Sequence, residues 1–152
     1  MLHLSRKVLF AIEAVLDIAY HTSSEPVQSK EITRRQGIPR RYLEQALQHL
    51  VRDGILLGVR GPKGGYRLAR PATDINVRDI ITVFEGSIAL TECNLDGVLC
   101  DQSDVCSTSD NWKRINVAVL EALEAISLAD MTEQDFVPVF RLQRGMALTE
   151  VH

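Results

Sequence analysis

Residues 40–68 read RRYLEQALQHLVRDGILLGVRGPKGGYRL. In the first half of this stretch, apolar side chains recur at the helical repeat of about 3.6 residues, at Leu43, Ala46, Leu47, Leu50 and Val51. The pattern predicts a helix with one buried face. Pro39 before it suits the first turn of a helix, where its missing N–H is not needed, and Gly54 after it suits a helix end.

The opposite face of this helix is polar and carries long donors and acceptors, namely Arg40, Arg41, Glu44, Gln45, Gln48, His49 and Arg52. Such side chains reach base edges and phosphates in a DNA major groove, although a solvated helix face has a similar composition. The second half of the stretch separates the two interpretations. Two short β-prone runs, 55–59 and 66–68, flank a basic tip at 60–65 whose glycines can take positive φ.

A basic hairpin directly after a polar-faced helix is the layout of a winged helix-turn-helix. The helix enters the major groove, and the hairpin, or wing, enters a minor groove, where arginine is favoured. The apolar pattern predicts two more helices before this pair, over Arg6–His21 and over Val27–Gln36. A further short helix is predicted over Val77–Glu85, with Asp74 or Asn76 as its cap.

A longer helix is predicted over Trp112–Ile126, where apolar residues lie on both sides. A small domain cannot bury such a helix alone. Pairing with a second copy would cover it, and DNA-binding domains of this kind usually bind two half-sites as two-fold dimers. One more helical turn is expected within Ser127–Asp135, and residues 136–152, which lack a clear period, are expected to form a loosely held tail.

Charge is divided unevenly along the chain. Residues 1–71 hold 12 Lys and Arg against 6 Asp and Glu, whereas residues 72–152 hold 5 against 14, and the whole chain has a net charge of -3. A basic front half joined to an acidic rear half fits a nucleic-acid-binding module with a separate sensing or assembly region.

Composition excludes several classes of protein. The 152 residues are 45% hydrophobic, which is enough for the core of one ordinary domain. No stretch approaches the ~20 apolar residues of a membrane span, and the N-terminus is a poor signal peptide, so we expect a cytoplasmic protein without a membrane partner. The four histidines form no spaced pair with an acid or nucleophile, so we do not expect an enzyme.

All three cysteines, Cys93, Cys100 and Cys106, fall within 14 positions of an irregular segment, with the spacing Cys-x6-Cys-x5-Cys. Packing cysteines would be scattered, and a cluster in a cytosolic chain favours metal or redox chemistry over disulfides. Metal or iron–sulfur ligation is the first hypothesis, a redox thiol switch the second, and no role the third. The spacing is not that of a zinc ribbon, and an iron–sulfur cluster would need a fourth ligand from elsewhere.

Several stretches together resemble the Rrf2 family of bacterial transcription regulators: the run Tyr42–Gln45, the wing at 59–66, the segment 74–85, and three cysteines before a Trp-led helix. The resemblance extends from Leu2 to about Met131 and is most specific in the wing and the cysteine spacing. It implies a mainly α fold with a small β-hairpin, in which a long helix crosses to the partner of a homodimer. It also implies a double-stranded DNA operator and an iron–sulfur cluster on the three cysteines that changes DNA affinity.

The resemblance also assigns residues to DNA. Arg60 matches the wing arginine that enters the minor groove, and Glu44 matches the acid that reads bases in the family's iron–sulfur biogenesis regulator. Arg41 and Tyr42 match neighbouring contact positions. The full set of predicted DNA-binding residues is Gln28, Ser29, Arg40, Arg41, Tyr42, Glu44, Gln45, Arg60, Gly61, Lys63, Gly64, Gly65 and Tyr66.

The chain departs from the family at the fourth cluster ligand. The biogenesis regulator has a histidine where this chain has Ser109, and the nitric-oxide regulator uses an aspartate of the partner chain where this chain has Leu9. The remaining candidates are Ser109, Asp110, Asp96, Asp101, Asp104, a partner-chain Glu13 or His3, and a small exogenous thiol or water. Loss of the histidine favours a 4Fe–4S over a 2Fe–2S cluster.

The expected organisation is a winged helix-turn-helix region at 1–72, a connecting helix at 73–90, a cysteine loop at 91–110, a dimerisation helix region at 111–135 and a tail at 136–152. The expected function is a transcription regulator whose cluster senses redox, nitric-oxide or iron status. The alternative is an Rrf2-type regulator without a cluster, which senses through free thiols or through a protein partner such as a cysteine-synthesis enzyme.

Overall fold

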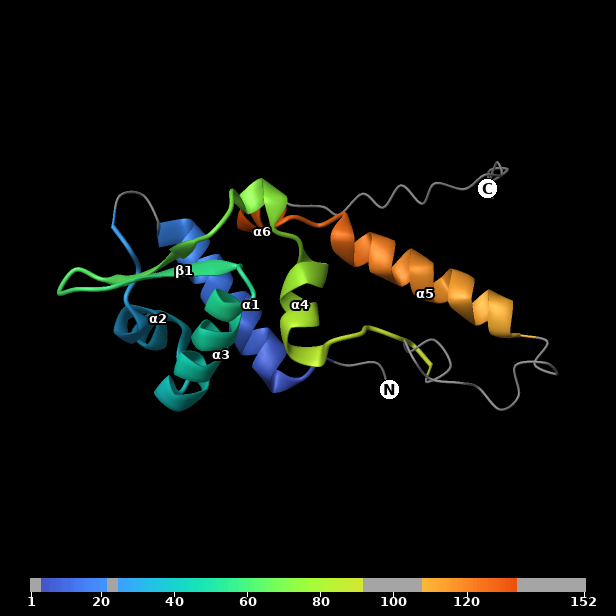
Figure 1. The fold of residues 1–152 in the computed structure, drawn as a ribbon, viewed down its shortest axis with the longest axis horizontal. Helices are drawn as coiled ribbons and strands as arrows, with labels where there is room; N and C mark the ends of the chain where they lie inside the picture. Colours follow the sequence, from blue (N-terminus) through green and yellow to red (C-terminus); the bar gives the residue numbers. More distant parts are fainter. Residues whose placement is uncertain (1–3, 22–24, 92–107, 134–152) are drawn as a thin grey trace.

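The computed structural model describes residues 4–21, 25–91 and 108–133 of the chain. Its elements are α1 (Arg6–His21), α2 (Ser29–Gln36), α3 (Arg40–Arg52), β1 (Leu56–Val59), β2 (Gly65–Leu68), the 3-10 turn η1 (Ala72–Asp74), α4 (Val77–Glu85), α5 (Ser109–Glu124) and α6 (Leu128–Thr132). The chain is therefore mainly helical with one small hairpin (Figure 1), which confirms the expected fold class.

Helix α1 lies at the centre of the fold and packs against α2, α3, α4, α6 and β2. Its Val15 is fully buried, as are Leu43, Leu47 and Leu50 of α3. Burial of each such side chain contributes about 1.5–3 kcal/mol, because apolar surface is removed from water. The apolar stripe predicted for α3 is confirmed, and Val51 lies half-buried at its edge.

The wing (residues 56–68) is an antiparallel hairpin anchored to the chain before α2. Its register pairs Leu56 with Leu68, Leu57 with Arg67, Gly58 with Tyr66 and Val59 with Gly65. On the other side of β2, the N–H of Val27 donates to the Tyr66 carbonyl at 2.9 Å, and the N–H of Tyr66 donates to the Val27 carbonyl at 2.8 Å. Glycine at position 65 permits this approach, because a Cβ there would collide with the Val27 carbonyl. Val27 is therefore paired with the hairpin, and the helix predicted over Val27–Gln36 begins only at Ser29.

Helices α4 and α6 begin with similar caps, and the two capping residues lie side by side. The Asn76 side-chain oxygen accepts the N–H of Asp79 at 2.8 Å, and the Ser127 hydroxyl accepts the N–H of Asp130 at 3.1 Å. Each bond satisfies an N–H of the first helical turn that has no partner within the helix. Asn76 and Ser127 also form a backbone bridge, beside which Leu128 is buried. Of the two predicted caps of α4, Asn76 is used, and the turn predicted near the end of the chain is α6.

Helix α5 extends away from the other elements (Figure 1). It begins at Ser109 rather than Trp112, because its polar first turn carries no apolar pattern that would reveal it. Its buried residue is Asn116, whereas Trp112, Ile115 and Val117 are exposed by 41%, 45% and 51%. The rest of the described chain thus leaves much of α5 uncovered. Among the described residues, no helix is long and apolar enough to cross a membrane.

Candidate nucleic-acid interface and cysteine segment

The first turns of α3 present cations and acceptors to solvent. Arg40, Arg41, Tyr42 and Gln45 are exposed, and Glu44 is half-buried. The Arg40 Nε donates to Glu44 Oε1 at 2.7 Å, and this bond raises the pKa of Arg40. Arg40 is therefore a cation at any physiological pH, and the Glu44 carboxylate is held along the polar face of the helix.

The tip of the wing is closed by its own backbone. The Gly64 N–H donates to the Gly61 carbonyl at 2.9 Å, and Gly61 has a φ of +111°, which disfavours a side chain there. Lys63 Nζ lies 3.6 Å from a Glu25 carboxylate oxygen. Arg60 is exposed and has no ion pair within the described residues, so it is the free cation of the tip.

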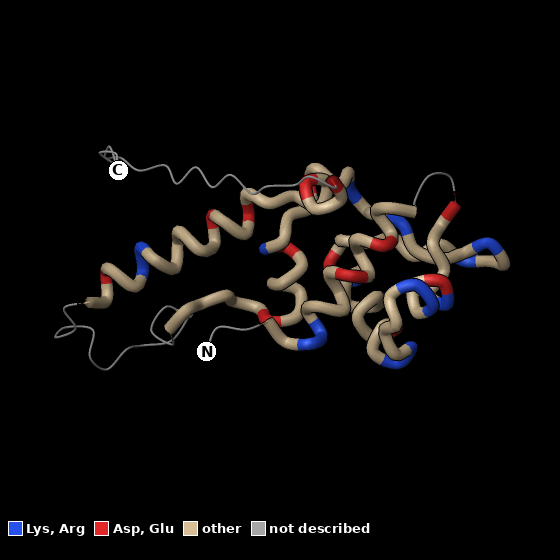
Figure 2. Tube along the Cα trace, turned by 180° about the vertical axis from the view of Figure 1, so that it is seen from behind, with Lys and Arg blue, Asp and Glu red and all other residues tan. Residues whose placement is uncertain are grey.

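The start of α2 lies against the wing. The Gln28 side-chain amide donates to the Pro62 carbonyl at 3.5 Å, and Ser29 is half-buried in the first turn of α2. Of the other predicted wing contacts, Gly65 and Tyr66 are half-buried where the hairpin meets the chain before α2. The structure thus brings α2, α3 and the wing together at one end of the molecule, and basic residues gather there (Figure 2).

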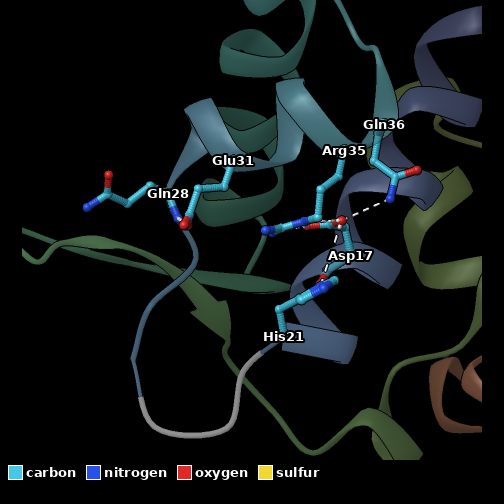
Figure 3. Close-up of polar contacts among 6 residues, drawn as sticks. All are labelled: Asp17, His21, Gln28, Glu31, Arg35 and Gln36. Atoms are coloured by element: carbon cyan, nitrogen blue, oxygen red, sulfur yellow. Dashed lines mark hydrogen bonds and ion pairs between the residues drawn. The ribbon is translucent and has the colours of Figure 1, made fainter.

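A buried carboxylate that sequence reasoning missed ties α2 to α1 (Figure 3). Asp17 is 1% exposed and accepts Arg35 Nε at 2.9 Å, Arg35 Nη2 at 2.7 Å and Gln36 Nε2 at 2.9 Å. The His21 Nδ1 lies 2.8 Å from the backbone carbonyl of Asp17, so this nitrogen carries the proton that it donates. The available signal was an acid inside the otherwise apolar run Arg6–His21.

The protonation of this cluster follows from its contacts. Burial raises the pKa of Asp17, but the hydrogen bonds from Arg35 and Gln36 outweigh burial and hold it below the ordinary value of 3.8. The same bond to Asp17 raises the pKa of Arg35. Both groups are therefore charged at neutral pH, and their two-point contact fixes the last turn of α2, from which the chain enters α3.

Helix α4 contacts both α3 and α5. The rings of His49 in α3 and Phe84 in α4 meet edge to face, with centroids 5.8 Å apart. Beyond α4, Asn116 of α5 accepts the N–H of Leu90 at 2.9 Å and donates to the Ile88 carbonyl at 3.5 Å. The chain that leads toward the cysteines is therefore held on α5 by a buried amide.

The three predicted cluster ligands, Cys93, Cys100 and Cys106, lie outside the described residues, as do Asp96, Asp101, Asp104 and His3. Among the other candidates for a fourth ligand, Ser109 and Asp110 form the first turn of α5, and Glu13 is exposed on α1. No three His, Cys, Asp or Glu residues gather as a metal site in the part of the chain that the structure describes. The cysteine segment thus starts just after the Asn116 contact and ends where α5 begins.

Residues 4–134 match the Rrf2 family, described as "Iron-dependent Transcriptional regulator". The chain belongs to the Rrf2 family. It is therefore a DNA-binding transcription regulator, and the resemblance to this family is confirmed.

Named relatives of this Rrf2 protein are regulators, which are not enzymes. It is 35% identical over 139 residues to the HTH-type transcriptional regulator IscR of Serratia proteamaculans, covering 91% of this chain and 84% of the relative. The solved structure of IscR from T. potens is 38% identical with a TM-score of 0.68, over 86% of this chain and 85% of that one. The structure of CymR, the global cysteine regulator of B. subtilis, is 31% identical with a TM-score of 0.74, over 87% and 97%.

Proposed function

We propose that this Rrf2 regulator binds a DNA operator as a homodimer, and that an iron–sulfur cluster on Cys93, Cys100 and Cys106 controls its affinity in response to redox, nitric-oxide or iron status. The observation that carries the proposal is that the exposed cations of the candidate DNA interface lie apart from the segments that flank the cysteines. The exposed start of α3, α2 and the wing tip gather at one end of the molecule, whereas the described chain after α4 and the start of α5, between which the cysteines fall in the sequence, lie away from that end (Figure 1).

In the proposed complex, α3 enters the major groove. Arg41, Tyr42 and Gln45 are exposed and long enough to reach base edges or phosphates, and Glu44 accepts a hydrogen bond from a cytosine amino group. Arg60 enters the minor groove from the wing tip, where the negative potential favours arginine. Lys63 and the exposed Gly61 at the wing tip contact phosphates, which position the wing without reading sequence.

Helix α5 supplies the proposed dimer interface. Its exposed Trp112, Ile115 and Val117 lie on a helix that the rest of the protomer covers only in part. A second α5 packed against it would remove this apolar surface from water. A two-fold pair of protomers then places two α3 helices on two half-sites of the operator.

The chemistry of the cysteine segment fits an iron–sulfur cluster. Three thiols closely spaced in one segment are soft ligands of the kind that hold such clusters, and Ser109 and Asp110 stand at its end as candidates for a fourth ligand. A bound cluster would supply iron that reacts with oxidants or nitric oxide, with 4Fe–4S favoured over 2Fe–2S. The protein itself must then convert binding or loss of the cluster into a change at the DNA-binding helix.

Transmission to DNA follows the contacts of α4. Asn116 holds Ile88 and Leu90, so displacement of the cysteine segment pulls on the end of α4 or on α5. Helix α4 contacts α3 through Phe84 and His49. Movement at either helix therefore changes the placement of α3 or the spacing of the two α3 helices in a dimer, and with it the specific affinity.

Purification without oxygen tests the cluster. The wild type is expected to contain iron and acid-labile sulfide and to absorb visible light, and Cys100→Ala is expected to lose both while eluting at the same volume. A colourless wild type that gains neither iron nor sulfide on reconstitution contradicts the proposal. Footprinting on the DNA upstream of its own gene tests the interface, and Arg60→Ala is expected to weaken protection.

A second candidate keeps DNA binding but lets free thiols or a protein partner act as the sensor. The similarity to the structure of CymR, the global cysteine regulator, favours it. Iron-free protein whose DNA affinity still changes with oxidant would support the thiol form. Iron-free protein that responds only to an added cysteine-synthesis enzyme would support the partner form.

A further inference from the structure

The start of α1 lies beside the start of α3. A surface hollow of about 480 Å³ lies between them. It is lined by Arg6, Lys7 and Phe10 from α1 and by Pro39 and Tyr42 at the start of α3, among others. The rings of Phe10 and Tyr42 are 6.3 Å apart between centroids, which joins the two helices directly. The start of α1 is therefore next to the surface that the proposed function places on DNA.

Lys7 is also close to the outward face of α3. It lines a second, smaller hollow together with Tyr42, Gln45 and His49. Two of these, Tyr42 and Gln45, are among the residues proposed to contact DNA. A cation on α1 thus borders the polar face of the recognition helix, although α1 belongs mainly to the core.

Arg6 and Lys7 are both exposed, and neither has an ion pair or hydrogen bond through its side chain in the described part of the chain. Other cations nearby are engaged, since Arg35 is bound to Asp17 and Arg40 to Glu44. In Figure 2 the basic start of α1 and the basic start of α3 lie along the same edge of the molecule. Two unpaired cations there are suited to an anion that also reaches α3.

We propose that Arg6 and Lys7 bind the phosphate backbone of the operator, beside the major groove that α3 enters. This rests on the proposed function and extends it, because it makes α1 part of the DNA interface. Both side chains end in charged donors of the kind that bind phosphate oxygens, and such contacts fix the position of the protein on the duplex without reading its sequence. Glu85 lines the same hollow and opposes an anion there, so its removal is expected to act in the opposite sense.

The test is fluorescence anisotropy of the full-length protein on its footprinted operator and on a scrambled duplex of equal length, over a range of salt concentrations. Loss of phosphate contacts weakens binding to both duplexes and leaves their ratio unchanged. The Arg6→Gln, Lys7→Gln double variant is expected to bind both about a thousandfold more weakly at low salt, and this deficit is expected to narrow as the salt concentration rises. Its slope of log affinity against log salt is expected to fall in magnitude by about 0.9 per lost phosphate contact, or about 3.6 for two protomers.

The matched control removes the same two charges from α5, as Lys113→Gln with Arg114→Gln; because α5 is the proposed dimer helix, its mass in sedimentation is compared with that of the wild type, and a control of unchanged mass is expected to keep affinity and slope unchanged. Glu85→Gln is expected to strengthen binding to both duplexes. An unchanged slope for the α1 variant, or an equal change in the α5 control, overturns the proposal. If the wild type binds and Arg60→Ala weakens it while the α1 variant has no effect, only this inference fails; if the wild type binds neither duplex, the proposed function fails first.

Discussion

Replacement of Asp17 by asparagine tests whether one buried carboxylate holds the helix-turn-helix together. Asparagine keeps the size of the side chain but removes its charge and one acceptor oxygen. The Arg35 guanidinium then loses its two-point contact, and an amide group faces it in place of an oxygen. The last turn of α2 loses its bond to α1, so the helix pair that carries α3 is expected to loosen.

The expected loss follows from the contacts. Breaking one partner of a buried ion pair costs about 3–5 kcal/mol. Arg35 is 25% exposed, so water can replace part of what it loses. We therefore expect the free energy of unfolding to fall by about 2–3 kcal/mol, a large share of the ~5–15 kcal/mol typical of a domain.

The difference between the two proteins should depend on pH. Because the pKa of Asp17 is below 3.8 in the folded protein, the unfolded chain binds this proton more readily. The contribution of Asp17 is therefore fully present above about pH 5, and it is lost as the pH falls through the lowered pKa. The gap between wild type and Asp17→Asn is expected to be full at pH 7 and to shrink below about pH 4.

Urea unfolding followed by circular dichroism measures this gap. The control is Glu25→Gln, which makes the same chemical change in an exposed pair with Lys63 at 3.6 Å and is expected to cost less than about 0.5 kcal/mol. A loss below about 1 kcal/mol for Asp17→Asn, or a gap that widens as the solution is acidified from pH 5 to 3, would refute the reasoning.

Three other substitutions test the dimer interface on α5, the packing of the wing, and the link between α5 and the chain before the cysteines. Ile115→Asp places a charge on the exposed face of α5 and is expected to halve the mass in sedimentation; an unchanged mass argues against dimerisation through this face. Gly65→Ala drives a Cβ into the Val27 carbonyl and is expected to cost about 1–3 kcal/mol in urea unfolding, whereas Gly58→Ala, where a Cβ meets open space, is expected to be nearly neutral. Asn116→Ala removes the bonds to Leu90 and Ile88 and is expected to speed loss of iron under air without changing the elution volume; unchanged iron retention would remove Asn116 from the coupling.

Local periodicity was sufficient to predict most helices. The apolar stripe of α3 and the bounds of α4 depend on residues a few positions apart, and the glycine-rich tip determines where the hairpin turns. These features need no knowledge of distant contacts, so the sequence pattern reveals them. The position of the exposed cations of α3 and the wing tip follows from the same patterns.

Contacts between residues far apart in the sequence cannot be predicted from local patterns. Val27 pairs with Tyr66, which shortens α2, and the partners of Asp17 come from another helix. Nothing in the local pattern indicates that Asn116 is buried; it is buried because it binds Leu90, 26 residues earlier in the chain. In each case a polar or backbone group is satisfied by a partner that only the folded chain brings near.

The most direct test of the account compares DNA binding by one preparation in two states. Protein purified without oxygen is titrated onto its footprinted operator before and after the iron is removed with a chelator, and Cys100→Ala is titrated beside it. The account predicts that removing iron changes operator affinity by about tenfold or more, within the usual range for coupled sites, and that Cys100→Ala binds like the stripped protein in both cases. Equal affinity before and after removal of bound iron would contradict control of DNA binding by the cysteine segment.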